Sequence, residues 1–452
     1  MADLAALWSA ERVLPLAPDP ASAKAGQGLA NTRKWTALGR DELSLWGLCQ
    51  GSGKAPYQTQ IDLSEPAFKC TCPSRKFPCK HGLGLFLLLC QEPAAFARAS
   101  APAWVEEWRA NRAKRAEKKD KKEKSEAAAE DPEAQGRREA DKARRAGNRE
   151  ARVAAGTHEL DLWLRDVMRR GLADVQRESY RFWEAMAARM VDSQAPGLAR
   201  LLREMPGAVA KGPGWEDRLL ECLGVLYLAV QGYQRIQSLT PAAQEDLRTL
   251  IGWTQDQEQI LSQPTVTDEW FVMGQSQETE ERLRVQRTWL WGTKTEQAAL
   301  VLDFAHGSAP LDVSLTPGTK FKGSVAYFPS AFPLRALVRE HATFMAVDRW
   351  LGKESVRAAL DACAEVLAQN PWAGRLPVNL AAVTPLLDGE RWLVRDAHGD
   401  LLPLNVPPLT GWSLYSFSGG ASVGLFGEWE DYALRPLGAW NEQGYLSLKG
   451  RP

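Results

Sequence analysis

The sequence contains no long hydrophobic run. Its longest apolar stretch, residues 83–90, is far shorter than the roughly 18 to 20 residues of a membrane-spanning helix, so we expect no transmembrane segment. The N-terminus also lacks a basic start followed by an apolar segment, which argues against a secretory signal. We therefore predict a cytoplasmic protein with no membrane partner.

The sequence also has no excess of charge. Its 452 residues include 56 lysines and arginines and 56 aspartates and glutamates, so the formal net charge is zero. A neutral chain has no strong overall preference for nucleic acid. The charge is unevenly distributed, however, because residues 1–124 hold 20 basic and 13 acidic side chains. This asymmetry favours an acidic partner, such as DNA or RNA, for the basic N-terminal region.

Familiar catalytic motifs are missing as well. The sequence has no H-E-x-x-H, no G-x-S-x-G, no G-x-G-x-x-G after a strand and no pair of Walker motifs. The Gly-Ser-Gly-Lys segment at residues 51–54 does not fit a phosphate loop, because Leu48 stands where a glycine is needed and Ala55 where a serine or threonine is needed. We therefore predict that the protein is not an enzyme.

Histidine is scarce, which limits acid–base chemistry. The chain has five histidines, and His306, His341 and His398 stand alone in the sequence. Asp303 and His306 could form an acid–base pair at a strand end, although a catalytic base needs positioned partners that a sequence cannot display. The alternative hypothesis is an enzyme or regulator with an unrecognised active site in the C-terminal region. A pocket that joins a histidine to acidic residues would favour it.

The most informative segment of the chain is residues 70–81, which read C-x-C-x6-C-x-H. Residues two apart in a strand point to the same side, so Cys70 and Cys72 can present two sulfurs to one ion. The intervening loop contains two prolines and can turn the chain back, so that Cys79 and His81 arrive as a second pair before an apolar helix. Three cysteines and one histidine are a ligand set of closed, tetrahedral zinc sites. We predict one structural Zn²⁺ ion.

The charges near this motif support a metal site. Three thiolates, a neutral imidazole and Zn²⁺ sum to a net negative charge, which Arg75, Lys76 and Lys80 can offset. The N-terminus of the following helix also stabilises a thiolate at Cys79. The alternative, disulfide pairing or scattered free thiols, would leave His81 unexplained. The remaining cysteines are isolated in apolar segments and are expected to be buried: Cys49, Cys90, Cys222 and Cys363.

At these residues the sequence resembles the SWIM zinc finger family, whose pattern is C-x-C-xn-C-x-H. The flanking text also fits, since a strand at residues 57–63 precedes the first cysteine and Cys79-Lys-His-Gly-Leu opens a helix. The resemblance covers about residues 35–95 and implies a small ββα zinc module without a catalytic role. The ligands that it implies are Cys70, Cys72, Cys79 and His81.

The layout of the chain, an N-terminal SWIM finger followed by a long region without recognised motifs, is similar to that of bacterial SWIM proteins. Members of the family are proposed to bind DNA or proteins. Bacterial members are often encoded near MoxR-type AAA+ ATPases and von Willebrand A proteins, so the resemblance implies such proteins as partners. We therefore expect an adaptor whose structural zinc site supports protein or nucleic-acid binding.

Composition divides the chain into four parts and predicts an α+β multidomain fold. Residues 1–108 form the zinc module, and residues 109–156 form a charged linker that is too polar to bury a core. This linker should be disordered or a solvated single helix that acts as a spacer, or else a polybasic arm for nucleic acid. Residues 157–262 form a helical domain, and residues 263–452 form a β-rich domain with one helix.

Apolar spacing predicts the elements within these parts. Leu160, Leu164 and Val167 begin a series of stripes with helical periodicity, which indicates four or five helices packed as a bundle. In the N-terminal part, residues 35–49 alternate loosely and indicate one strand. In the C-terminal part we expect a helix at 354–369, strands at 270–273, 283–291, 299–304 and 324–328, and hairpins at 391–404 and 412–426.

Two residue groups in the C-terminal region leave alternatives open. The acids Glu428, Glu430 and Asp431 lie beside tryptophan and could chelate a hard cation, but a solvated acidic cluster at a strand edge is the expected arrangement. Several tryptophans could build a recognition surface, but we expect a β core because tryptophan is buried on average. These are Trp289, Trp291, Trp392, Trp412 and Trp429.

Overall fold

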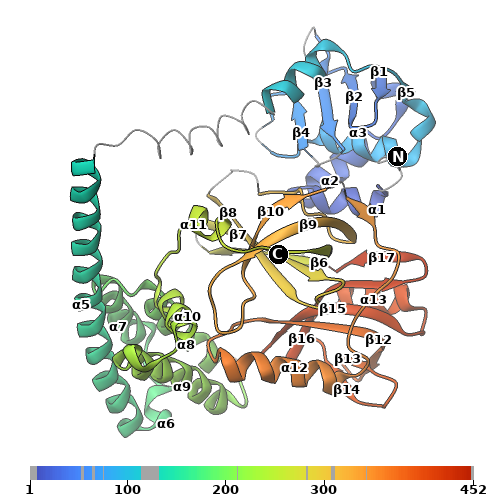
Figure 1. Cartoon of the computed structure of the whole chain (residues 1–452). Helices are drawn as coiled ribbons and strands as arrows, with labels where there is room; N and C mark the ends of the chain where they lie inside the picture. Colours follow the sequence, from blue (N-terminus) through green and yellow to red (C-terminus); the bar gives the residue numbers. More distant parts are fainter. Residues whose placement is uncertain are drawn as a thin grey trace.

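The computed structural model of the chain describes residues 8–51, 55–63, 67–74, 76–112, 132–210, 212–280, 283–306, 311–342 and 344–448. An N-terminal α/β module sits above two packed β-sheets, and a helical bundle lies to one side of the sheets (Figure 1). This arrangement is the mixed α+β multidomain fold that the sequence predicts. No helix among the described residues is long and apolar enough to cross a membrane.

The N-terminal module is a five-stranded sheet, in the order β4-β3-β2-β1-β5, covered by helix α3. The predicted ββα unit is present as β3, β4 and α3, and the sheet extends it by three strands. The elements are α1 (Ala10–Val13), η2 (Leu14–Leu16), α2 (Pro20–Gln27), η3 (Thr32–Lys34), β1 (Trp35–Arg40), β2 (Ser44–Cys49), β3 (Tyr57–Asp62), β4 (Ala67–Cys70), α3 (Lys80–Gln91), η4 (Pro93–Ala95) and β5 (Ala97–Arg98).

The prediction of one strand over residues 35–49 is wrong, because the chain turns between β1 and β2. The Asp41 carboxylate accepts the backbone N–H groups of Leu43 and Ser44 at 2.9 and 2.5 Å. Such a side-chain-to-backbone bond closes a tight turn, so β1 and β2 pair as an antiparallel hairpin.

Helix α3 is buried on nearly all sides, which explains its continuous apolar sequence. All nine residues from His81 to Leu89 are buried. One side of the helix packs on the sheet, where Gly82 meets the ring of Phe68. The other side packs on the N-terminal segment: an added Cβ at Gly26 would lie 2.8 Å from the Cβ of Leu83. The helix is therefore the core of the module.

The helical part begins with α5, a helix of 39 residues from Pro132 to Arg170. The domain boundary expected at residue 156 falls inside this helix, and Val153 is already fully buried in the bundle core. Residues 113–131 of the expected linker lie outside the described residues. The remaining helices are α6 (Leu172–Val175), α7 (Tyr180–Asp192), α8 (Pro196–Ala210), α9 (Trp215–Gln234), η5 (Ile236–Ser238), α10 (Pro241–Ile251) and α11 (Gln257–Leu261).

The bundle core is built from the apolar residues that recur with helical spacing in the sequence. Leu160 and Leu164 of α5, Trp183 of α7 and Leu226 of α9 are at most 2% exposed and belong to one apolar cluster. Thr240 caps the start of helix α10, because its hydroxyl accepts the Ala243 N–H. The expectation of four or five helices packed as a bundle is confirmed.

The first sheet of the C-terminal part has the strand order β10-β9-β6-β7-β8, and the short strand β11 pairs with β9. Its two faces belong to different cores, because Trp270 and Val272 face one cluster while Phe271 and Met273 face the other. The strands are β6 (Val266–Glu280), β7 (Leu283–Gly292), β8 (Ala298–His306), β9 (Thr319–Tyr327), β10 (Ala336–His341) and β11 (Met345–Ala346).

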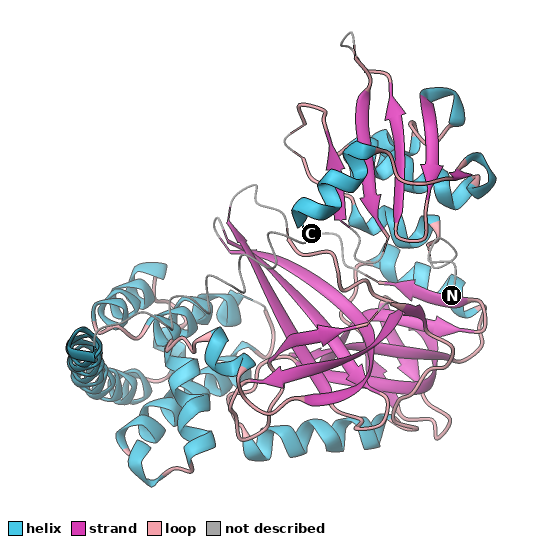
Figure 2. Cartoon of the chain, turned by 45° about the horizontal axis from the view of Figure 1, so that its top comes forward, coloured by secondary structure: helices cyan, strands magenta, loops and turns pink. Residues whose placement is uncertain are grey.

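The second sheet has the order β14-β13-β12-β15-β16-β17 and packs against the first, as the crossing strands in Figure 2 show. Phe426 and Leu437 of this sheet share a core with Trp289 of the first. The elements are α12 (Val356–Gln369), β12 (Leu376–Asp388), β13 (Arg391–Arg395), β14 (Leu401–Pro403), α13 (Pro408–Ser418), β15 (Val423–Glu430), β16 (Ala433–Asn441) and β17 (Gly444–Ser447).

The predicted strand at residues 412–417 is wrong, because this segment belongs to helix α13. Pro408 occupies the first turn of the helix, and Gly419 ends it with a positive φ of 56°. Gly411 lets the helix lie directly on Trp392, since an added Cβ would lie 2.2 Å from the indole. The β-rich part therefore has two long helices, α12 and α13, where one was expected.

Specific contacts join the three parts of the chain. The Asp246 carboxylate of α10 accepts the Ala331 N–H at 2.8 Å, and Trp372 packs against the bundle core. The Tyr432 hydroxyl donates to Glu221 of α9 at 3.2 Å. On the other side, Val313 packs against the core of the N-terminal module.

Candidate metal centre

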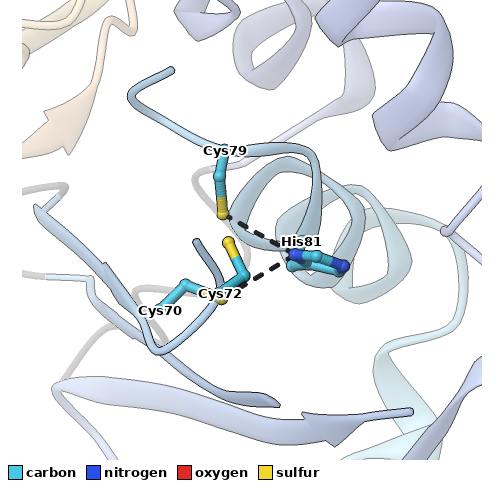
Figure 3. Close-up of side chains that lie close together, drawn as sticks. All are labelled: Cys70, Cys72, Cys79 and His81. Atoms are coloured by element: carbon cyan, nitrogen blue, oxygen red, sulfur yellow. Dashed lines mark hydrogen bonds between the residues drawn. The ribbon is translucent and has the colours of Figure 1, made fainter. Parts of the chain in front are cut away.

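The four predicted ligands converge on one point of the N-terminal module. Cys70 ends strand β4, Cys72 lies in the following loop, Cys79 precedes α3 and His81 lies in its first turn. Their ligand atoms all lie within 4.8 Å of one another (Figure 3). The structure thus confirms that the motif brings its ligands together, because the loop turns the chain back and places both ligand pairs around one point.

The distances between the ligand atoms suit zinc. His81 directs Nδ1 toward the sulfurs, at 3.8 Å from Cys70 Sγ and 4.0 Å from Cys79 Sγ. Bond lengths of about 2.3 Å to sulfur and 2.0 to 2.1 Å to nitrogen place tetrahedral ligands about 3.5 to 3.8 Å apart. The four residues are therefore positioned to bind one zinc ion, and they occupy all four tetrahedral positions.

Backbone pairing and an ion pair hold the loop that carries the ligands. The Thr71 N–H donates to the Gln58 carbonyl at 3.0 Å, which continues the β3–β4 pairing past Cys70. Lys76 forms a 2.8 Å ion pair with Asp19 at the start of α2. The Phe77–Pro78 peptide bond, directly before Cys79, is cis. Burial is greatest at the second ligand pair, because Cys79 and His81 are only 7% and 6% exposed.

The thiols interact strongly even without a metal ion. The pKa of Cys79 is lowered to about 4, because the thiol of Cys70 and then the ring of His81 hydrogen-bond to its sulfur. The same bond to Cys79, together with burial, raises the pKa of Cys70. Burial raises the pKa of Cys72. Zinc binds cysteine as thiolate, so zinc binding releases protons from these thiols.

One supporting residue could not be found from the sequence. The Thr59 hydroxyl of β3 lies 3.2 Å from Cys70 Sγ, and its side chain is fully buried. It donates a hydrogen bond to this sulfur once the thiol is deprotonated. Thr59 is opposite Cys70 in the β3–β4 register. The motif carries no sign of that register, because Thr59 precedes Cys70 by eleven residues of ordinary strand and turn sequence.

Comparison with protein families identifies two segments. The SWIM zinc finger model matches residues 57–90, and the model of a SWIM-associated four-helix bundle domain matches residues 148–251. No curated protein and no solved structure matches the chain. The first match covers all four ligands and the second covers most of the bundle. The chain therefore carries a zinc finger, and the two matches identify it as a SWIM zinc finger with its associated four-helix bundle.

The other candidate residues form no second metal site in the part of the chain that the structure describes. The Asp303 carboxylate accepts the backbone N–H groups of Phe304 and Asp312, and the His306 side chain is exposed. His341 packs against the rings of Phe321 and Phe344. His398 is exposed in the predicted turn, which Asp396 closes.

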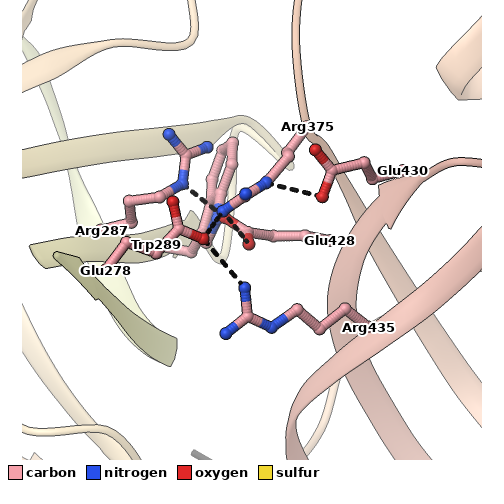
Figure 4. A network of polar contacts seen from close by, with 7 residues as sticks. All are labelled: Glu278, Arg287, Trp289, Arg375, Glu428, Glu430 and Arg435. Carbon is pink, nitrogen blue, oxygen red and sulfur yellow. Dashed lines mark hydrogen bonds and ion pairs between the residues drawn. The ribbon is translucent and has the colours of Figure 1, made fainter. Parts of the chain in front are cut away.

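Glu428 corrects the expectation of a solvated acidic cluster, because its side chain is fully buried between the sheets (Figure 4). Its Oε1 accepts hydrogen bonds from Arg287 Nε at 2.7 Å and from Trp289 Nε1 at 2.8 Å. Its Oε2 lies 3.7 Å from Arg375. The local sequence around Glu428 is rich in acids, and it cannot reveal that arginines from distant parts of the chain surround this side chain.

Arg375 connects Glu428 to two further acids. It pairs with Glu278 of β6 and, at 2.8 Å, with Glu430. Arg435 of β16 also reaches Glu278, at 3.1 Å. Burial alone would raise the pKa of Glu278, but these two arginines outweigh it and lower the pKa. The network therefore joins charged side chains of both sheets, and the tryptophan core around it is confirmed at Trp289 and Trp291.

Substitution of Cys79 by serine removes one of the four ligands. We expect the zinc content of the purified protein to fall from about one ion per chain to near zero, because three ligands cannot close a structural site. Metal analysis by mass spectrometry measures this. Cys90→Ser is the matched control, since Cys90 lies near the end of the helix that Cys79 precedes and is outside the cluster. Equal zinc content in Cys79→Ser and the wild type would contradict the site.

Substitution of Thr59 by valine tests the supporting hydroxyl. Valine keeps the shape and removes the hydrogen bond to Cys70, so we expect zinc affinity to fall by about tenfold without loss of the site. Competition with a chromophoric chelator measures the affinity. Thr36→Val, at an exposed position of β1, should leave the affinity unchanged. An unchanged affinity in Thr59→Val would show that the hydroxyl contributes nothing.

Substitution of Glu428 by glutamine removes the buried negative charge and leaves Arg287 and Arg375 incompletely paired. We expect the free energy of unfolding of the β-rich part to fall by about 3 kcal/mol, measured by urea denaturation. Glu430→Gln is the control, because Glu430 is 44% exposed and its loss should cost less than about 1 kcal/mol. Equal midpoints for the two variants would contradict a structural role for the buried charge.

Proposed function

We propose that this protein is a binding adaptor whose finger uses zinc only as a structural ion. The four protein ligands fill the tetrahedral positions that a catalytic zinc would leave partly open to water. Strand β4 has only four residues and one pairing neighbour, so the ion adds a second link between this strand and α3. The finger therefore presents a surface whose shape depends on zinc and performs no chemistry itself.

The exposed side chains of the zinc loop support this proposal most directly. Lys69, Lys76 and Lys80 are exposed around the ligand cluster, and the ring of Phe77 is 41% exposed between them. The edge contact between Phe77 and the buried Phe68 anchors that ring. We name Lys69, Lys76, Phe77 and Lys80 the zinc-loop surface. Its positive charge suits an anionic macromolecule, and nucleic acid is the partner class that we propose first.

A protein partner is the second candidate. The zinc-loop surface offers one exposed aromatic ring, whereas proteins that grip single strands use several rings interleaved with basic groups. An acidic protein surface needs only the charge. The resemblance to bacterial SWIM proteins suggests AAA+ ATPases of the MoxR type and von Willebrand A proteins as partners of this kind.

We also propose a cytoplasmic location, because the cysteines are not joined in disulfides. All seven cysteines lie within the described residues, and all are free thiols. Free thiols persist in reducing compartments, whereas secreted proteins commonly oxidise them to disulfides. A reducing compartment also keeps three cysteines available as zinc ligands.

Nucleic-acid binding across a series of salt concentrations tests the proposed function. We expect the zinc-loaded protein to bind single- or double-stranded DNA, and chelation of zinc to abolish binding. Lys80→Glu should weaken binding about tenfold and lower the salt dependence, because a phosphate contact is lost. Fluorescence anisotropy measures both quantities. Lys294→Glu, at an exposed position of the β7–β8 turn, is the control of equal charge change.

Two outcomes separate the alternatives. Replacement of residues 113–131 by a neutral linker leaves α5 and the bundle intact, so binding that disappears in this variant belongs to a polycationic tether and contradicts binding by the finger. Absence of binding to every nucleic acid near physiological salt would direct the proposal to a protein partner.

A further inference from the structure

Helix α13 is unusual in this chain because it carries no charge. Residues 401–427 contain no aspartate, glutamate, lysine, arginine or histidine, although a quarter of the whole chain is charged. The helix buries Gly411, Leu414 and Ser418 against the second sheet. Its opposite side is exposed, with Leu409 at 80% and Trp412 at 52%. An exposed helix of this kind normally carries polar residues on its solvent side.

The exposed apolar residues form one continuous patch. The indole of Trp392, under the helix, lies 5.1 Å from that of Trp412 and 6.3 Å from the ring of Tyr415. Leu387 pairs with Trp392 across β12 and β13, so the two side chains share one face of the sheet. Leu387 and Tyr415 are 40% and 42% exposed. We name Leu387, Leu409, Trp412 and Tyr415 the α13 patch.

The central stripe of the solvent side of α13, formed by Leu409, Trp412, Ser413 and Ser416, is large at one end and small at the other, and Tyr415 lies at its flank. Leu409 and Trp412 are bulky, and Ser413 and Ser416 follow on the same side at helical spacing. The Ser413 hydroxyl donates to the Leu409 carbonyl at 2.8 Å, so it folds back onto its own helix and adds little height. Gly419 and Gly420, which end the helix, add no side chains. Along this stripe, the bulky half is thus followed by a flat half.

We propose that the α13 patch binds a second copy of this chain, as the centre of a two-fold symmetric dimer. In such a dimer each contact between two residues occurs twice, so the surface must complement itself. Two antiparallel α13 helices satisfy this condition, because Leu409 and Trp412 of one copy lie over Ser416 and Ser413 of the other. Aromatic residues at the centre of an interface also contribute most of its binding energy.

The charges favour a copy of the chain over a charged partner. A patch without ionisable groups gains nothing from an acidic or basic partner, and it brings no like charges together when two copies meet. The formal net charge of zero removes long-range repulsion between copies as well. The patch lies on the second sheet, apart from the zinc-loop surface, so the proposal is independent of the proposed function (Figure 1).

Sedimentation velocity of the full-length, zinc-loaded protein over a range of concentrations tests the proposal. We expect dimers at concentrations on the order of 100 µM, and we expect Leu409→Glu to raise the dissociation constant at least about tenfold, because it buries an unpaired charge at the interface. Leu409 is too exposed for this change to disturb the fold. Leu401→Glu is the matched control, since Leu401 is 53% exposed and lies on β14, outside the patch.

A cysteine at position 413 gives a second measurement. Ser413 lies near the proposed two-fold axis, so Ser413→Cys should form a covalent dimer under mild oxidation, and addition of Leu409→Glu should prevent it. A monomeric wild type at every concentration overturns the proposal. A dimer that survives Leu409→Glu, or one that Leu401→Glu disrupts equally, overturns it too, because another surface then holds the copies together.

Discussion

The convergence of four donors between β4 and α3 is the constraint on which the N-terminal module depends. Strand β4 has only four residues and lies at the edge of its sheet, where one neighbour supplies all its backbone pairing. Helix α3, in contrast, is buried over nearly its whole length. The zinc site joins this short edge strand to the buried helix at the helix N-terminus. The lysines around the loop are exposed because the ligands between them point inward.

Much of the metal centre could be predicted from the sequence, because the ligand types and their spacing report local geometry. Cys70 and Cys72 follow from strand periodicity, and Cys79 and His81 follow from the helix start. Thr59 could not be predicted, since its role depends on a strand register. The burial of Glu428 could not be predicted either, because its partners are distant in the sequence. Arg287 lies 141 residues upstream, and Arg375 lies directly before β12. Long-range partners leave no local pattern.

The difference between local patterns and long-range partners also explains which parts of the fold could be predicted. Leu160, Leu164 and Leu226 revealed the bundle because helical periodicity is a local signal. The segment around Trp412 resembles a strand in composition because it is rich in aromatic residues, whereas Pro408 and Gly419 set the ends of a helix. The hairpin of β1 and β2 was missed because Asp41 makes its turn through one side chain rather than through a glycine-rich sequence.

Helix α5 has a mechanical consequence. A helix of 39 residues is about 58 Å long, and its C-terminal half is part of the bundle core (Figure 1). The N-terminal half cannot bend independently of the bundle, as a flexible tether would. The reach of the chain on this side is therefore set by a rigid rod rather than by the square-root law of a random coil. A rotation of the bundle therefore moves the far end of this rod farther than its base.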